Sequence, residues 1–259
     1  MLCDSHIHLG FLSEGQILEI CENFSNGFLV SCAQDLEDFE RQQRRAKELE
    51  KKGITIICAL GIHPLYLNAL NLDTLDTLLK PSEKQSEALT KQPVAAAVGE
   101  VGLDFYTKEL KDKSAEQENI FALQLEFAIK KALPVVIHSR KALQRMFYYA
   151  PLLKQCKAVV FHGFEGSANE AKAFLKRGVN AYFGIGKTLL KGDKSAAECV
   201  KGIEKTRLLF ETDSPYQRLK GEEASSPVDV EKVIAKAREM IKISDEQIIE
   251  NFKNAFDIH

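Results

Sequence analysis

The chain has 259 residues, of which 45% are apolar and 28% are charged, and it contains no tryptophan. A composition of this kind can bury a sizeable core, so an intrinsically disordered chain is excluded. The formal net charge of -2 excludes a broadly basic surface that would hold nucleic acid by charge alone. Any polyanion would therefore need a local binding site.

The cysteines indicate a reducing compartment. There are six, and no two form a Cys-x-x-Cys pair; Cys3, Cys32 and Cys58 lie in apolar runs, where a buried, reduced thiol is expected. The segment MLCDSHIHLG lacks the basic and apolar regions of a signal peptide, and no run of 18 apolar residues occurs. We therefore expect a cytoplasmic protein that does not contact a membrane, and nothing in the sequence indicates an obligate protein partner.

Eight short apolar runs rich in valine, isoleucine, leucine and phenylalanine recur along the chain. They begin at Leu2, Phe28, Ile54, Ala95, Pro134, Ala158, Ala181 and Leu208. Continuous apolar runs without period-two alternation are typical of strands that are covered on both faces, as in a parallel sheet.

Helix-like segments separate these runs. They are Leu36–Lys52, Ala115–Ala132 after a capping box of Ser114 and Gln117, a helix that opens with Ser167 and Glu170 and ends at Gly178, Val228–Lys242, and Asp245–Phe256 after Ser244 and Gln247. The alternation predicts an α/β fold, either a closed barrel or an open doubly wound sheet. No linker or repeat divides the chain, so residues 1–259 are expected to form a single domain.

Two basic segments, Arg41–Lys52 and Lys187–Lys194, alternate with acidic or apolar residues. This pattern favours solvated helix faces or loops over nucleic-acid-binding patches. The sequence GIGKT at 184–188 looks like a phosphate-binding loop, but Ala181 stands where such a loop requires glycine. A nucleoside-triphosphatase is therefore excluded.

Polar residues that could carry chemistry follow the predicted strands. His6 and His8 end the first run, His63 the third, Glu100 and Asp104 the fourth, His138 the fifth, His162 the sixth and Asp213 the eighth. A lone histidine on an apolar run is usually a hydrogen-bonded core residue. Five of the six histidines, however, fall at the carboxyl ends of strands, which a barrel brings to one rim. This placement predicts metal binding.

The spacing and residue types indicate which metals would bind. In His6-x-His8 the two side chains point to the same face of an extended strand and can hold one ion together. Imidazoles with the carboxylates of Glu100 and Asp213 suit Zn²⁺, Mn²⁺, Co²⁺ or Ni²⁺, with Mg²⁺ as a further candidate. Six candidate ligands exceed the need of one tetrahedral ion, so we expect two divalent ions, roughly 3.5 to 4 Å apart and bridged by a carboxylate.

Six segments resemble, in order and spacing, the signature segments of the TatD family of the metal-dependent hydrolase superfamily. They are DSHIH at 4–8, GIHP at 61–64, GEVGLDFY at 99–106, PVVIHSR at 134–140, HGFEG at 162–166 and ETDSPY at 211–216. The resemblance covers the whole chain. It implies a TIM-type (β/α)₈ barrel and a deoxyribonuclease that releases nucleotides from DNA ends, as a 3'-5' exonuclease on single-stranded or frayed DNA.

The resemblance also implies a role for each site residue. His6, His8 and Asp213 would hold one ion, His138 and His162 the other, and Glu100 would bridge them. Water or hydroxide between the ions would attack the phosphodiester, with Asp213 and Glu100 as the catalytic carboxylates. His63, Asp104 and Arg140 would face the substrate, although a structural role in the loop is the alternative for Asp104. Arg140 is the expected phosphate clamp, because a guanidinium offers two parallel donors.

Two features depart from the family pattern. Glu165 stands where relatives usually have serine or threonine, and a carboxylate there could repel a phosphate or add a metal contact. The loop at 221–227, GEEASSP, lacks the expected asparagine.

Two other functions remain open at this point. The same barrel and ligands could polarise the carbonyl of a C–N or ester bond, as in an amidohydrolase. The second alternative is a non-enzymatic binding protein whose metals are structural.

Overall fold

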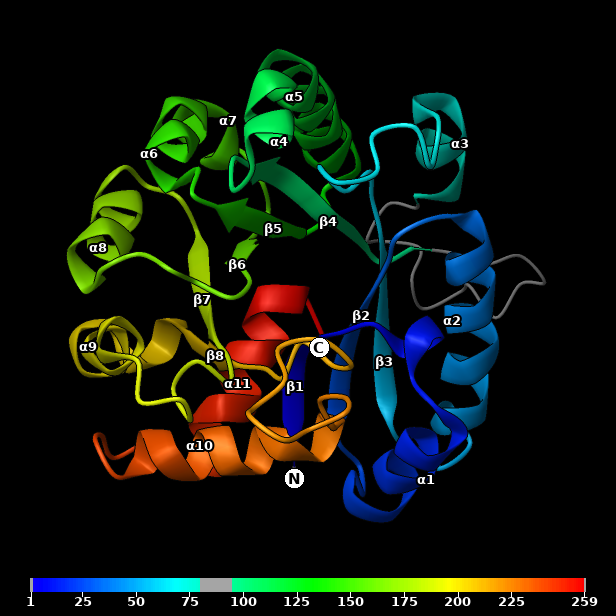
Figure 1. The fold of residues 1–259 in the computed structure, drawn as a ribbon, viewed down its shortest axis with the longest axis vertical. Coiled ribbons are helices and arrows are strands. Elements are labelled where there is room, and N and C mark those ends of the chain that lie inside the picture. The colour runs from blue at the N-terminus through cyan, green and yellow to red at the C-terminus, as the bar shows by residue number, and fades with distance from the viewer. Residues whose placement is uncertain (1, 80–94, 259) are drawn as a thin grey trace.

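The computed structural model describes residues 2–79 and 95–258, and they form an eight-stranded parallel barrel inside a ring of helices (Figure 1). The strands are β1 (Cys3–Ile7), β2 (Phe28–Ala33), β3 (Thr55–Leu60), β4 (Ala97–Asp104), β5 (Val135–Arg140), β6 (Val159–Phe161), β7 (Ala181–Ile185) and β8 (Leu208–Phe210). Each strand pairs with the next one along the chain. All eight predicted strands are present.

The barrel is nearly closed between β1 and β8. The Asp213 amide donates to the His6 carbonyl at 2.9 Å, and the His8 amide donates to the Ser214 carbonyl at 2.7 Å. Because the spatial order of the strands is their order in the sequence, the expected barrel is confirmed, and the open doubly wound sheet is wrong.

Most of the helices surround the barrel, whereas the last one, α11 (Asp245–Phe256), lies inside that ring in the view of Figure 1 and donates from Asn251 to the Leu208 carbonyl at the start of β8. The other helices are α1 (Glu14–Asn23), α2 (Leu36–Glu50), α3 (Leu72–Leu78), α4 (Lys108–Asp112), α5 (Ser114–Lys131), α6 (Leu143–Met146), α7 (Ala150–Leu153), α8 (Ala168–Lys176), α9 (Lys194–Gly202) and α10 (Val230–Arg238), with short 3₁₀ turns η1 (Leu9–Phe11), η3 (Phe147–Tyr149), η4 (Lys205–Arg207) and η5 (Pro227–Asp229). No helix of the described residues is long and apolar enough to cross a membrane.

The residues that cap the helices can be compared with the capping residues predicted from the sequence. Ser167 and Glu170 form the expected capping box at α8, and Ser244 caps α11 at the expected position. The capping box predicted for Ser114 and Gln117 is wrong, because α4 runs almost directly into α5 and Lys113 occupies the N-cap position. Gln117 instead points inward, where it accepts from the Asp104 amide at 2.8 Å and donates to the Asp104 carbonyl at 3.1 Å.

Helix lengths differ from the expected bounds by a few residues. Helix α2 ends at Glu50 rather than Lys52, and α8 ends at Lys176, before Gly178. The segment predicted from Val228 begins as the turn η5 and becomes α10 only at Val230. Helix ends of this kind are set by local hydrogen bonds, which composition describes poorly.

Strand β4 is the longest strand and carries both Glu100 and Asp104. Between them, Gly102 has φ +147°, and a Cβ at this position would lie 1.9 Å from the His138 carbonyl oxygen. Only glycine allows β4 to approach β5 this closely. The approach brings the carboxylates of β4 beside the histidine of β5.

The basic segment Lys187–Lys194 is only partly solvated. Its later residues are exposed, as predicted, but Lys187 is completely buried. The Lys187 Nζ lies 2.5 Å from Asp229 Oδ2 and 2.7 Å from Glu222 Oε2. Both carboxylates follow β8, so Lys187 ties the loop after β7 to the loop after β8. The sequence pattern could not predict this, because the partners lie 35 and 42 residues away.

Candidate metal centre

The first pair of candidate ligands comes from β1. His6 lies near the end of this strand and His8 directly follows it, and their Nε2 atoms are 3.3 Å apart. The extended backbone points both rings to one side, as the H-x-H spacing predicts. The Nδ1 atom of His8 lies 2.9 Å from the Cys32 carbonyl oxygen. This contact places the ring proton on Nδ1 and leaves Nε2 as a lone-pair donor.

Glu100 lies between two groups of histidines. Its Oε2 faces the β1 pair, at 3.4 Å from His6 Nε2 and 3.7 Å from His8 Nε2. Its Oε1 lies 2.7 Å from both His138 Nδ1 and His162 Nε2. Each carboxylate oxygen therefore faces a different set of imidazoles.

Asp213 completes the side of the β1 pair. Its Oδ1 lies 3.3 Å from His8 Nε2 and 3.6 Å from His6 Nε2. Its backbone has φ +54°, a left-handed conformation that is rare outside glycine and occurs preferentially at functional sites. The hydrogen bond that the Asp213 backbone amide donates to the His6 carbonyl, between the ends of β8 and β1, holds this conformation in place.

Charge and burial oppose each other at the two carboxylates. Burial alone would raise the pKa of Glu100, but the imidazoles of His162, His63 and His6 outweigh it and hold that pKa well below its usual range. Burial is also outweighed at Asp213, whose pKa is lowered by the hydrogen bond with His8 and by the charge of His6. Both carboxylates are therefore ionised at neutral pH, as cation binding requires.

A second layer of polar groups holds these side chains in place. Asp4 accepts from Thr212 Oγ1 at 2.6 Å and from the His6 amide at 3.1 Å, which joins β1 to the loop after β8. Glu211 accepts from the Gly163 amide at 2.5 Å, and its Oε1 lies 3.5 Å from His162 Nδ1. The sequence analysis missed both residues. For Asp4 the signal was its position two residues before His6, which puts both side chains on one face of β1. Glu211 lies beyond the end of β8, so its sequence position carries no such signal.

His63 lies closer to the centre than a residue that only faces substrate. Its Nε2 is 3.3 Å from Glu100 Oε1, and its ring centroid is 4.6 Å from that of His138. One ligand atom each from His63, Glu100 and His138 lies within 4.8 Å of the others, so this trio could also hold an ion.

Asp104 contacts the protein rather than the open cavity. It is completely buried, its Oδ2 lies 3.1 Å from His138 Nε2, and its Oδ1 accepts from the Tyr106 amide at 2.8 Å. This geometry favours the alternative that Asp104 has a structural role, because it orients a histidine and fixes the loop that follows β4.

Arg140, at the end of β5, stacks on Tyr106. Its guanidinium carbon lies 3.6 Å from the centroid of the Tyr106 ring. Within residues 2–79 and 95–258, its guanidinium makes no hydrogen bond or ion pair, so its donors remain free for a ligand.

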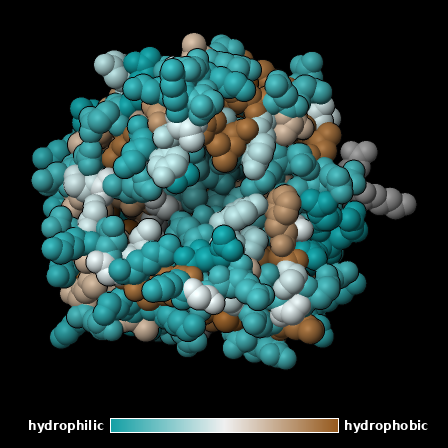
Figure 2. Space-filling model, viewed as in Figure 1, coloured by the Kyte–Doolittle hydropathy of each residue, from teal (hydrophilic) through white to brown (hydrophobic). Residues whose placement is uncertain are grey.

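A cavity of about 630 Å³ opens onto the centre, and its wall includes His138, His162, Asp213, Arg140 and Gln217. Figure 2 shows this face of the molecule hollowed near its middle, with mostly hydrophilic side chains around the hollow. The partly exposed edges of His138 and Asp213 contrast with the buried His6 and His8. A ligand therefore reaches the centre from the side of β5, β6 and β8.

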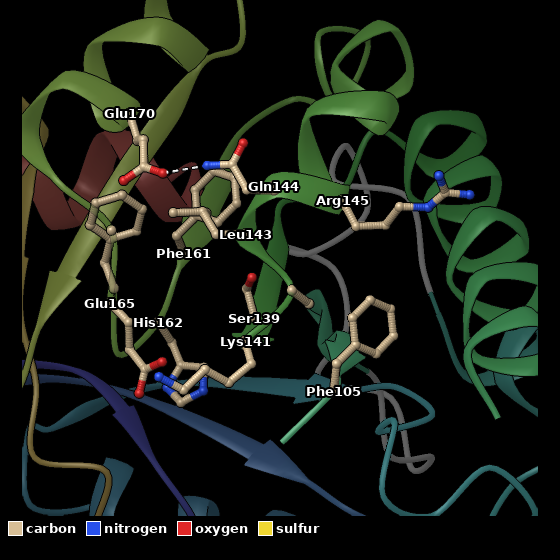
Figure 3. A pocket seen from close by; sticks show the side chains of 13 residues that line it. Phe105, Ser139, Lys141, Leu143, Gln144, Arg145, Phe161, His162, Glu165 and Glu170 are labelled. Carbon is tan, nitrogen blue, oxygen red and sulfur yellow. Dashed lines mark hydrogen bonds between the residues drawn. The ribbon is translucent and has the colours of Figure 1, made fainter. Parts of the chain in front are cut away.

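A second cavity of about 430 Å³ adjoins the first and shares His162, Ser139 and Glu165 with it. Its inner wall is apolar, with Phe105, Leu143 and Phe161, and a hydrogen bond of 2.6 Å between Gln144 and Glu170 spans its upper edge (Figure 3).

Glu165 is exposed where the two cavities meet, and Figure 3 shows its carboxylate lying toward His162 and Lys141. It does not cap α8, since Ser167 and Glu170 do so.

The donor set fits divalent cations. His6, His8 and Glu100 form one group whose ligand atoms all lie within 4.8 Å of one another, and His6, His162 and Asp213 form another. Five imidazoles converge on two ionised carboxylates, and within the part of the chain that the structure describes no lysine or arginine forms an ion pair with either carboxylate. Nitrogen and oxygen donors in this arrangement suit Zn²⁺ and its first-row neighbours.

Comparisons with known proteins agree with a site that binds divalent cations. The family model described as TatD related DNase matches residues 3–257. An uncharacterised metal-dependent hydrolase from Buchnera aphidicola is 33% identical over 232 residues, which cover 83% of this chain and 81% of that protein. The 3'-5' ssDNA/RNA exonuclease TatD of Shigella flexneri is 30% identical over 68% of this chain.

Coverage of the relatives is uneven. For two of the first four relatives, the aligned stretch spans 56% and 64% of the relative's own length. In three dimensions, the crystal structure of YjjV, a TatD homologue from Escherichia coli K12, superposes with a TM-score of 0.81 at 24% identity, and the match covers 100% of this chain and 98% of that one. This likeness shows the barrel fold.

Proposed function

This chain belongs to the family of TatD-related DNases, and from that premise we propose that it hydrolyses phosphodiester bonds at the ends of single-stranded DNA with the help of two divalent ions. One observation carries the proposal: the two oxygens of Glu100 face two different groups of imidazoles beside an open cavity. A carboxylate that bridges two cations needs this arrangement. Family membership also makes the chain a metal-dependent hydrolase, so the non-enzymatic alternative is set aside.

The proposed ligands follow the geometry. His6, His8 and Asp213 would hold one ion, His138 and His162 the other, and Glu100 would bridge them. Mg²⁺, Mn²⁺, Zn²⁺, Co²⁺ and Ni²⁺ are all compatible with these donors. When bound, such a pair supplies Lewis-acid activation of water and of a phosphoryl oxygen.

Each side chain near the centre has a part in the reaction. Asp213 is ionised and partly exposed to the cavity, so its carboxylate can accept the proton that the attacking water gives up. The free guanidinium of Arg140 is positioned to donate two parallel hydrogen bonds to a phosphate. The buried His6 and His8 face away from solvent and serve as ligands only.

The substrate is inferred from relatives and from the shape of the site. Several relatives are named 3'-5' ssDNA/RNA exonuclease TatD. The cavity shares part of its wall with a second cavity, and two adjoining cavities suit a flexible strand end better than a rigid duplex. We therefore place single-stranded or frayed DNA first, and RNA second.

The cysteines support a location in the cytoplasm. All six are free thiols, and five of them are buried. This usage favours a reducing compartment. We also propose that residues 1–259 act as one domain, since the ligands come from strands at both ends of the chain.

The test is digestion by the metal-loaded protein of end-labelled single-stranded DNA, single-stranded RNA, duplex DNA and a dipeptide, before and after chelation. We expect release of mononucleotides from single strands, lost with EDTA and restored by Mg²⁺ or Mn²⁺. Turnover of the dipeptide without cleavage of nucleic acid would favour the amidohydrolase alternative.

A further inference from the structure

Exposed apolar side chains gather around the mouth of the barrel. Six of the eight large ones among residues 2–79 and 95–258 lie in the segments that follow β1, β2, β3, β4 and β8; they are Phe11, Leu36, Leu65, Tyr66, Tyr106 and Tyr216. Such side chains scattered singly need no explanation, but a cluster around one opening marks a binding surface.

Three of these six are tyrosines, and each contacts a residue of the centre or its cavity. The ring of Tyr216 lies 5.0 Å from that of His8, and the ring of Tyr66 lies 5.8 Å from that of His63, measured between centroids. Tyr106 stacks on Arg140. As whole residues, Tyr216, Tyr66 and Tyr106 remain 42%, 45% and 56% exposed. Each of the three tyrosines therefore lies between the candidate metal centre or its cavity and the solvent.

The exposed ring of Tyr106 is also held in a fixed position. Its amide donates to Asp104 Oδ1, which fixes the backbone of its loop. One face of its ring is covered by the Arg140 guanidinium. Arg140 also lines the cavity whose wall includes His138 and His162. A phosphate bound by Arg140 would have its neighbouring base beside the Tyr106 ring.

We propose that Tyr66, Tyr106 and Tyr216 form a platform on which the unpaired bases flanking the scissile phosphodiester stack. The inference rests on the proposed function and adds the residues that select a single strand. Every base has a π face, so aromatic stacking accepts any sequence. Paired bases are already stacked within their duplex, so the platform favours single strands of DNA or RNA over duplex ends.

The experiment compares kcat/KM of the metal-loaded protein on a short single-stranded oligonucleotide, DNA in one arm and RNA in the other, with kcat/KM on bis(p-nitrophenyl) phosphate, which has no base. The variants are Tyr66→Ala, Tyr106→Ala and Tyr216→Ala, each paired with its phenylalanine variant. The matched control is Tyr148→Ala. Tyr148 is 73% exposed on η3 and also carries an arginine over its ring, Arg145 at 4.5 Å, but its ring pairs with no histidine of the centre among the residues that the structure describes.

We expect the ratio of kcat/KM for the oligonucleotide to that for the diester to fall about 5-fold or more in each alanine variant. The phenylalanine variants and Tyr148→Ala should keep the wild-type ratio, and metal content should stay at the wild-type level throughout. If the wild type cleaves the oligonucleotide and the alanine variants keep the wild-type ratio of the two kcat/KM values, the platform proposal is wrong, while the proposed nuclease function is still supported. If the wild type cleaves the diester but neither oligonucleotide, the nuclease function and the platform both fall.

Discussion

The carboxylate of Asp104 lies 3.1 Å from Nε2 of His138, on the side of the ring opposite the Nδ1 atom that faces Glu100. A carboxylate in this position holds the imidazole in one tautomer and one orientation, and it raises the basicity of the other nitrogen. The resemblance left Asp104 between a substrate contact and a structural role in its loop, and these contacts favour the structural role.

The first prediction concerns Asp104→Asn. The amide oxygen can still accept from the Tyr106 amide, but the NH₂ group would then face the N–H of His138 and repel it. We expect metal affinity or activity to fall roughly 10- to 100-fold. Titration with Mn²⁺ after chelation measures the affinity directly. An unchanged affinity for Mn²⁺ together with a raised KM would instead indicate that Asp104 contacts the substrate.

The second prediction concerns Glu100→Ala, which removes a carboxylate whose two oxygens face different groups of imidazoles. We expect loss of turnover and lower metal content, because two cations would repel each other without a bridging anion. The fold should persist, as judged by circular dichroism. Full occupancy by two ions in the purified variant, with wild-type turnover, would show that Glu100 does not bridge.

Arg140→Lys is the third change. Lysine keeps the charge but loses both the planar stack on Tyr106 and the two parallel donors. We expect kcat/KM on a phosphodiester to fall about 10-fold, since hydrogen bonds to charged groups contribute about 1.5–3 kcal/mol. Metal content, measured by atomic emission, should not change. Loss of metal would instead place Arg140 among the groups that support the ligands.

The fourth prediction concerns Glu165→Ser at the junction of the two cavities. The exposed carboxylate repels incoming phosphates, and added salt screens this repulsion over roughly 10 Å at 0.1 M. We expect kcat/KM on DNA to rise by up to about 5-fold in dilute buffer, with the gain shrinking as salt is added. A series of rates against salt concentration checks this. Equal rates for variant and wild type at every concentration would show that Glu165 only faces solvent.

Lys187→Met is the fifth change and tests the tie between the loops after β7 and β8. Removing the lysine leaves the buried Asp229 carboxylate with Lys232 alone, 2.6 Å away, so the free energy of unfolding should fall, but by less than the roughly 3–5 kcal/mol expected for a buried charge without any partner. Lys194→Met, at an exposed position, is the control. Chemical denaturation of both variants measures the difference, and equal stability of Lys187→Met and wild type would contradict the prediction.

The same pair has a pH dependence of known sign. Burial alone would raise the pKa of Asp229, but Lys187 and Lys232 lower it below the ordinary value. Its contribution to stability is therefore complete above the unfolded-state pKa of about 3.9 and is lost as the pH falls through the lower folded-state pKa. The difference in stability between wild type and Lys187→Met should accordingly shrink in acid.

Much of the fold could be predicted from the sequence by itself. All eight strands were expected, because apolar runs that are buried on both faces are a local property of the chain. The residues that the fold brings around Glu100 were also expected, since each follows a strand and the strands of a barrel end at one rim. The amino-acid sequence therefore determined the strands and the residue types of the centre, and the family resemblance implied the barrel, whereas the observed strand order excluded the open sheet.

Only the tertiary structure decided which contacts each side chain makes across the barrel. Gln117 left its predicted cap for the backbone of Asp104, Lys187 became buried between carboxylates from another loop, and Glu211 came to lie beside His162. None of these partners is close in sequence. The physical reason is that a buried polar group must find a hydrogen-bond partner wherever the closed barrel supplies one, and local periodicity carries no information about that partner.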